Sequence, residues 1–151
     1  MPQGAACQFF NPASALMPRQ APIKTITFTG ASGLGQVNVA VPLFTVSGDV
    51  LITRIMAKCT TGLAGATATI SVGTAGTVAG LIAVTTATGL TTTNKWWTDA
   101  TPAPMKSLAA LNKDAVLSDN IIINPLVAGV TGGVLVFYCE YIPLSAGASL
   151  S

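Results

Sequence analysis

Residues that commonly carry acid–base chemistry are few and dispersed in this chain. It contains no His, and its five carboxylates are Asp49, Asp99, Asp114, Asp119 and Glu140. General acid–base catalysis usually relies on His or on paired carboxylates whose acidities are tuned by their surroundings. Asp49 and Asp99, or Asp114 and Asp119, could approach one another, but Asp in turns commonly hydrogen-bonds the local backbone. The sequence therefore predicts no catalytic residues, and we expect the protein not to be an enzyme.

The three cysteines, Cys7, Cys59 and Cys139, are also widely separated. An odd number with no close pair does not indicate a disulfide framework. Zinc sites favour clustered Cys and His, so we expect no metal site. Cys59 and Cys139 lie within apolar, strand-like runs, and free Cys is among the most buried residue types. We predict that both are small buried side chains of the core.

A glycine-rich run, Phe28–Gly35, follows the strand-like stretch Ile23–Thr27. It resembles the glycine-rich turn of short-chain dehydrogenases, where a helix follows the glycines and its N-terminus holds the pyrophosphate. Here the next segment, Val37–Leu43, alternates like a strand and contains Pro42. The Tyr followed four residues later by Lys, which that family uses for proton transfer, is also missing. We interpret the glycines as a loop and expect no cofactor.

Charge is scarce throughout the chain. Charged residues make up 8% of the sequence, against a usual quarter or so, and the net charge is +2. The basic residues are scattered singly, which argues against a nucleic-acid-binding face. A soluble monomer normally keeps a well-charged surface, so we expect partners to cover much of this one.

No membrane segment is expected. The run Asn120–Cys139 is uncharged over a length that could cross a bilayer. Asn124-Pro125 and Gly132-Gly133 interrupt it, however, and its β-branched residues favour two strands joined by a turn. Residues 1–8 show no basic start before an apolar block, so we expect no signal peptide and assembly in the cytoplasm.

Alternating apolar and polar residues predict an all-β fold. Ser47-Gly48-Asp49 predicts a tight turn that makes a hairpin with the following strand, in which Leu51, Ile55 and Ala57 face one way. The last strand should place Leu135, Phe137, Cys139 and Tyr141 on one face. Besides Ile23–Thr27, the expected strands are Val37–Leu43, Val50–Lys58, Ala66–Val72, Ala79–Thr85, Asn94–Asp99, Asn120–Asn124 and Val134–Ile142.

About eight short strands with Gly and Pro turns indicate an antiparallel β-sandwich or jelly roll, with a barrel as the alternative. Pro42 places its strand at a sheet edge or a bulge. The one helical candidate is Met105–Leu111. We expect a β-sandwich domain over residues 23–151.

Residues 1–22 differ from the rest, because four prolines are spaced through a segment without periodicity. We predict an extended N-terminal arm. Its large apolar side chains would be costly to leave in water, so we expect a partner surface to cover them.

Trp96 and Trp97 are adjacent in an expected strand. Because adjacent side chains on a strand point to opposite faces, one of the two should lie outside the core. Trp is also common among the energetic hot spots of interfaces. The candidate partner-contact residues are Phe9, Phe10, Leu16, Met17, Trp96 and Trp97.

Several short segments of the sequence resemble segments of small virion proteins of tailed bacteriophages: Ala66–Ala75, Trp96–Pro102, Asp119–Ile123, Gly132–Tyr138 and Tyr141–Ser145. Among these proteins the chain most resembles head decoration, or cement, proteins with a jelly-roll or sandwich fold. The resemblance covers about residues 23–145. It implies a protein that binds the exterior of an assembled capsid as a homotrimer and clamps neighbouring major-capsid subunits together.

Two other functions stay open at this point. A tail or fibre component of a phage would contain the same kind of sequence segments. A carbohydrate- or receptor-binding β module could use an exposed Trp to stack on a sugar ring, with Asn94, Lys95 and Asp99 as the local polar residues.

Overall fold

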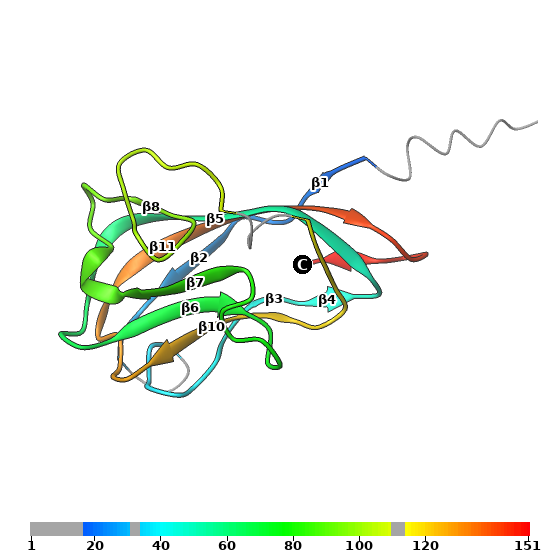
Figure 1. Cartoon of the computed structure of the whole chain (residues 1–151). Helices are drawn as coiled ribbons and strands as arrows, with labels where there is room; N and C mark the ends of the chain where they lie inside the picture. Colours follow the sequence, from blue (N-terminus) through cyan, green and yellow to red (C-terminus); the bar gives the residue numbers. More distant parts are fainter. Residues whose placement is uncertain (1–16, 31–33, 110–113) are drawn as a thin grey trace, which may run out of the picture.

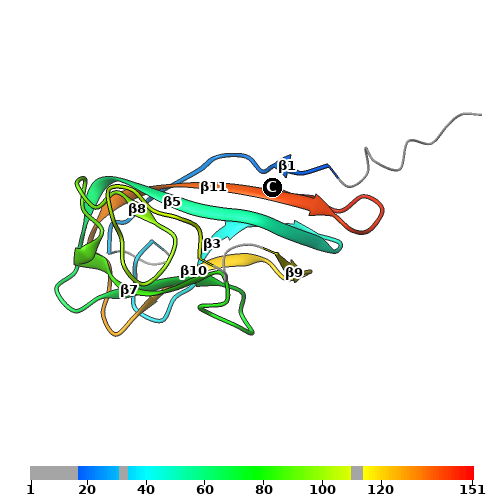
Figure 2. The ribbon, with the colours of Figure 1, turned by 45° about the horizontal axis from the view of Figure 1, so that its top comes forward.

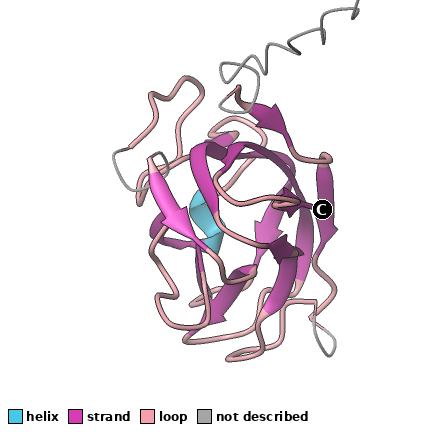
Figure 3. Cartoon of the chain, turned by 90° about the vertical axis from the view of Figure 1, so that its right-hand side faces the viewer, coloured by secondary structure: helices cyan, strands magenta, loops and turns pink. Residues whose placement is uncertain are grey.

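Two antiparallel β-sheets pack face to face in the computed structural model, which describes residues 17–30, 34–109 and 114–151 (Figure 1). The view in Figure 2 separates the layers, with β5 and β11 above β3, β7 and β10. Strands dominate, and the described residues contain one short 3₁₀ turn, η2 (Ala87–Gly89), shown in cyan in Figure 3. The prediction of an all-β sandwich is confirmed.

The first sheet is built on two long central strands. The strand β5 (Val50–Ala64) pairs along most of its length with β11 (Gly132–Pro143). Short strands line both sides of this pair. Those along β11 are β1 (Arg19–Gln20) and β2 (Lys24–Thr27), and those along β5 are β8 (Trp96–Trp97) and β9 (Ala115–Leu117).

The second sheet has the order β3-β10-β6-β7. Its strands are β3 (Val41–Phe44), β10 (Ile121–Leu126), β6 (Thr69–Gly73) and β7 (Ile82–Thr86). A separate two-stranded ladder joins β4 (Val46–Ser47) to β12 (Ser149–Leu150) near the C-terminus.

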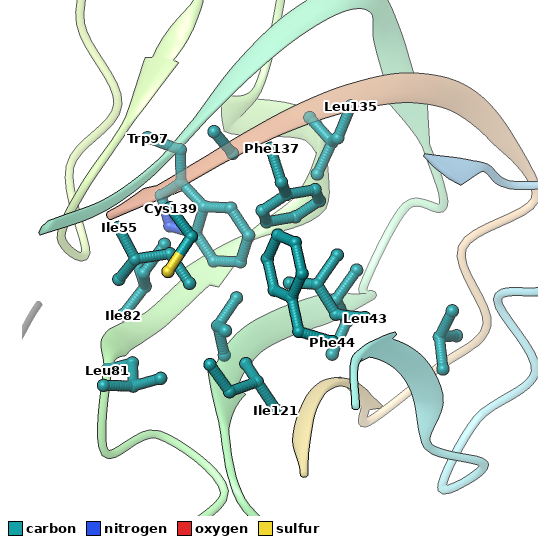
Figure 4. Close-up of a cluster of buried hydrophobic side chains, with 14 of the residues drawn as sticks. Leu43, Phe44, Ile55, Leu81, Ile82, Trp97, Ile121, Leu135, Phe137 and Cys139 are labelled. Carbon is teal, nitrogen blue, oxygen red and sulfur yellow. The ribbon is translucent and has the colours of Figure 1, made fainter. Parts of the chain in front are cut away.

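The core lies between the two sheets (Figure 4). As predicted, Leu135, Phe137, Cys139 and Tyr141 of β11 all point inward and are buried. Trp97 is fully buried and meets Phe137 edge-on, with ring centroids 6.4 Å apart. Each large apolar side chain buried here contributes about 1.5 to 3 kcal/mol. The opposite sheet contributes Phe44, Ile70, Val72, Ile82, Ile121 and Ile123.

A β-bulge in β5 changes which residues face the core. Arg54 pairs with Glu140 but Ile52 pairs with Tyr141, so Thr53 is an extra residue in the ladder. Before the bulge the inward residues are Val50 and Ile52, and after it they are Ile55, Ala57 and Cys59. The prediction that Leu51 shares a face with Ile55 and Ala57 is wrong, because the extra residue shifts the alternation by one.

The predicted hairpin around Gly48 is also wrong. The chain does turn there, with Gly48 at φ 69°, but β4 pairs with β12 while β5 pairs with β11. The turn is held by the β11–β12 connection: Ser145 Oγ accepts a hydrogen bond from the Asp49 N–H at 2.9 Å. The residues on either side of Gly48 therefore pass into different sheets.

Several strand ends differ from the expected ones. Residues 37 and 38 form a turn, with Asn38 at φ 59°, and residues 39–40 belong to no strand, so β3 begins only at Val41. The strand expected from Ala66 begins at Thr69, the one from Ala79 begins at Ile82, and the one at 94–99 shortens to β8. The described part of the helical candidate, residues 105–109, contains no helix.

Pro42 and Pro125 lie inside strands where the missing N–H costs no ladder bond, and a third proline, Pro143, ends β11. Pro42 belongs to the edge strand β3, beside a register irregularity, as predicted. Pro125 lies inside β10, which the sequence suggested would end at Asn124. Its carbonyl accepts the Asn38 N–H at 2.9 Å, on the side where the pairing with β3 has ended. An N–H at Pro125 would point to that same side, so β10 continues through the proline.

The described glycines of the Phe28–Gly35 run allow close backbone contact. Val130 N–H donates to the Gly35 carbonyl at 2.7 Å, and a Cβ on Gly35 would lie 2.1 Å from the Val130 oxygen. Turns follow Gly35, and residues 31–33 lie outside the described residues. The run packs against the β10–β11 connection.

The sheet begins earlier than the predicted domain boundary at residue 23. Arg19 and Gln20 form β1, and Ala21 is buried and donates its N–H to the Cys139 carbonyl at 2.9 Å. The last residues of the expected arm therefore belong to the sandwich. Residues 1–16 lie outside the described residues.

Candidate interaction surface

The outer face of the first sheet carries a cluster of aromatic and sulfur-containing side chains. Trp96 on β8, Met56 on β5 and Tyr138 on β11 alternate with the core residues Trp97, Ala57 and Phe137 or Cys139. Because successive side chains on a strand point to opposite faces, all three must point away from the core. They are partly exposed.

Trp96 leans across the sheet toward Tyr138. The two ring centroids are 6.4 Å apart with an interplanar angle of 48°, within the range of favourable aromatic pairs. Lys58, its partner in the ladder, places Nζ 5.9 Å from the centroid of the Trp96 ring, in the geometry of a cation–π contact. Trp96 is thus held by neighbours on its own sheet.

A groove of about 200 Å³ opens beside Trp96. Aromatic and thioether side chains form one part of it, and polar side chains form the other. We call it the Trp96 groove; it is lined by Gln20, Arg54, Met56, Trp96, Tyr138 and Glu140, with Cys139 beneath. Arg54 and Glu140 form an ion pair at 3.6 Å across the sheet. This partly exposed pair contributes only about 0 to 1 kcal/mol, but its charges offset one another.

A second hollow, of about 260 Å³, lies on the other side of Trp96 and Met56. Its remaining lining comes from the segment after β8, where Met105 is 90% exposed. That segment is tied to β8 by hydrogen bonds between Trp96 and Ala103 in both directions, at 3.0 and 3.1 Å. Thr98 Oγ1 also donates to the Ser107 carbonyl at 2.8 Å. The other lining residues are Thr98, Pro104, Lys106 and Leu108.

An ion pair between Asp99 and Lys106 at 2.9 Å fixes the same segment. Burial raises the pKa of Asp99, but hydrogen bonds from Lys106 and from the Thr101 N–H, with the Lys106 charge, outweigh it and leave that pKa lowered. The Thr101 N–H donates to Asp99 Oδ1 at 2.7 Å. Asp99 thus fills the backbone-capping role that the sequence suggested for an Asp in a turn.

The structure separates the predicted partner-contact residues. Trp97 is completely buried in the core and cannot contact a partner, so Trp96 is the tryptophan available on the surface. Met17 is 63% exposed just before β1. Phe9, Phe10 and Leu16 lie outside the described residues.

Five residues that line the groove beside Trp96 were not among those candidates: Gln20, Arg54, Met56, Tyr138 and Glu140. Alternation contained a signal for four of them, because each lies one residue from a predicted core position: Arg54, Met56, Tyr138 and Glu140. Gln20 could not be found in this way, since its strand β1 was assigned to the arm. Its place in the groove depends on pairing with Glu140.

The two described cysteines are buried and unpaired, as predicted. Burial raises the pKa of the Cys59 thiol, although backbone hydrogen bonds from Leu63 and Thr61 oppose the effect. Burial, together with the Glu140 charge, raises the pKa of Cys139 to about 12. Both thiols are therefore protonated at neutral pH. Within the described ranges no three His, Cys, Asp or Glu side chains gather closely enough to bind a metal ion.

No helix in the described part of the chain has the length and hydropathy needed to cross a membrane. Comparisons of the chain with protein-family models, curated proteins and solved structures found no match. The functional proposal therefore rests on the outer face of the first sheet.

Proposed function

We propose that this protein is a structural virion protein that decorates a phage capsid and cements neighbouring major-capsid subunits. The observation that supports this most directly is the outer face of the first sheet, where aromatic and thioether side chains lie exposed and the Arg54–Glu140 charges pair with each other. Such a face suits burial against another protein, because apolar contact stabilises it and little charge must be desolvated.

Prolines at two of the sheet edges disfavour strand addition there. Pro18 and Pro22 flank β1, and Pro42 lies in the edge strand β3. Prolines at edges discourage pairing with another chain. Met105 and Val116 then present large apolar side chains beside the outer face, at 90% and 67% exposure. We assign the capsid contact to this flank of the sheet.

The test is to add the purified protein to undecorated capsids in low salt and in molar salt. Rim ion pairs contribute about 0 to 1 kcal/mol each and weaken in salt, whereas apolar burial does not, so attachment should persist in molar salt. Met105→Ser together with Val116→Ser should weaken it, and Val84→Ser, an exposed Val on the other sheet, should leave it unchanged. Failure to attach, or release by salt alone, would contradict the proposal.

The groove also favours one other function. Trp96 and Tyr138 lie beside Gln20, Arg54 and Glu140, and aromatic rings next to hydrogen-bonding side chains are the usual means of holding a sugar ring. If the groove binds glycans, adding simple sugars should cause saturable chemical-shift changes in the NMR spectrum of the protein. Trp96→Ala should abolish these changes. A tail or fibre location would appear as attachment to tails in place of capsids.

A further inference from the structure

We propose that the Trp96 groove receives the N-terminal segment of a second copy of this chain, with Phe9 or Phe10 as the inserted side chain. The inference rests on the proposed structural role, in which copies of the protein associate on a particle. It assigns a specific contact to the homo-oligomer: residues 1–16 of one copy on β5, β8 and β11 of the next. The remaining outer face, near Met105 and Val116, stays available for the capsid.

The groove has the composition to hold an aromatic ring. Met56, Trp96 and Tyr138 line it, and the rings of Trp96 and Tyr138 stand at 48° to each other. A third ring placed there could meet both aromatics in tilted or edge-to-face contact, which is favourable beyond simple burial. A Phe pair in a segment without core periodicity is a matching anchor.

The charge of the N-terminal segment also matches that of the Trp96 groove. Residues 1–16 contain no Asp, Glu, Lys or Arg. The two charged side chains of the groove, Arg54 and Glu140, already form a pair at 3.6 Å. A neutral segment can therefore cover them without leaving an unpaired buried charge, which would be costly.

The direction of β1 favours a neighbouring copy over the chain's own groove. Arg19 lies opposite Tyr141, and β1 is antiparallel to β11, so the preceding residues continue toward the Pro143 end. Trp96 lies opposite Lys58, which pairs with Val136, five residues or about 17 Å back along β11. Phe9 lies ten residues before Arg19, and ten extended residues can span about 33 Å, so Phe9 can extend beyond its own sheet toward another copy.

Such a contact joins two different surfaces, the segment of one copy and the groove of the next. Contacts of this kind are heterologous, and they form closed rings when the rotation between copies closes. The expected trimer is a ring of this type. The blocked edges around Pro18 and Pro22 make side-chain insertion, in place of strand addition, the available mode.

Cys7 provides a probe in the full-length protein. Cys59 and Cys139 are buried with raised pKa values, so at neutral pH a benzophenone maleimide should label Cys7 selectively. After irradiation, we expect cross-links from Cys7 to peptides of β8 or β11 near Trp96 and Tyr138. Mixing isotope-labelled and unlabelled copies should show that these cross-links join different chains.

Sedimentation of substituted full-length chains completes the test. Phe9→Ala with Phe10→Ala, and separately Trp96→Ala, should raise the dissociation constant of the oligomer about tenfold or more and reduce the cross-link. Gln8→Ala with Asn11→Ala, in the same segment, and Val84→Ala, on the other sheet, should change neither. Circular dichroism checks that both the Trp96→Ala variant and the Phe9→Ala, Phe10→Ala variant remain folded.

Cross-links within one chain would overturn the inference in favour of self-docking. Cross-links that avoid the groove, or an oligomer unaffected by both variants, would also overturn it. The outcome is independent of the capsid assay: attachment without the cross-link would reject only this inference, and the cross-link without attachment would reject only the decoration role.

Discussion

At the scale of single residues, neighbouring side chains on one strand take opposite roles. Trp97 completes the core against Phe137, while Trp96, one residue earlier, forms the wall of an open groove. The same division separates Tyr138 from Phe137 and Cys139 on β11. A substitution at either member of such a pair therefore tests a different property: stability for the inward residue and association for the outward one.

Val127, between β10 and β11, has a strained backbone. Its φ is 66°, and the Ala128 N–H donates to the Leu126 carbonyl at 2.7 Å across it, which makes a γ-turn. A β-branched residue in this region costs about 1 to 3 kcal/mol, and its side chain is 74% exposed. We expect Val127→Gly to raise the free energy of unfolding by about 1 kcal/mol in urea denaturation, after the entropy cost of glycine.

Val116→Gly is the matched control for this change. Val116 is 67% exposed in β9, where the backbone is extended, so glycine should lower the free energy of unfolding by about 0.5 to 1 kcal/mol. Equal losses in the two variants would show that the turn at Val127 stores no strain.

At the scale of elements, the bulge in β5 keeps apolar side chains facing the core on both sides of an extra residue. Its first part buries Val50 and Ile52, and the part after Thr53 buries Ile55, Ala57 and Cys59. The bulge also brings Arg54 opposite Glu140 on the outer face, where the pair borders the Trp96 groove. Core alternation and groove polarity thus both depend on Thr53 being left out of the ladder.

Thr53 should be replaceable at the bulge, and its removal should leave the register of β5 with β11 intact. Its Oγ1 is buried and has no hydrogen-bond partner among the described residues, so Thr53→Val should raise the free energy of unfolding by about 1 kcal/mol. Thr25→Val, at an exposed position of β2, should have little effect. Deleting Thr53 would make Ile52 and Arg54 neighbours opposite the neighbours Tyr141 and Glu140, so the ladder would become regular with Ile52 and Ile55 still facing inward. We therefore expect the deletion variant to remain folded by circular dichroism. Loss of the folded state in the deletion variant would contradict this account of the bulge.

At the scale of the whole molecule, the N-terminal region divides within the predicted arm. Residues 19–21 pair with β11 and contribute a buried alanine, whereas the candidate contacts Phe9, Phe10 and Leu16 precede the described residues. Truncations that end at different residues should therefore change stability and association separately.

Two truncations test this division. Removing residues 1–17 should leave the melting temperature within a few degrees of the full chain, because β1 is retained, while the oligomer dissociates. Removing residues 1–22 should also lower the melting temperature, since it deletes β1 and the Ala21 N–H bond to Cys139. Calorimetry and sedimentation on both proteins distinguish the effects. Equal melting temperatures would show that β1 contributes nothing to the sandwich.

The sequence by itself determined the β class, the inward face of β11 and the opposite orientation of the two tryptophans. These follow from alternation along a strand, which is a local property. Only the tertiary structure decided that Thr53 forms a bulge, that β4 pairs with β12, and that Gln20 lies beside Trp96 and Tyr138. Those features depend on which distant segments pair and in which register, and that choice is made by burial and hydrogen bonding across the whole sandwich.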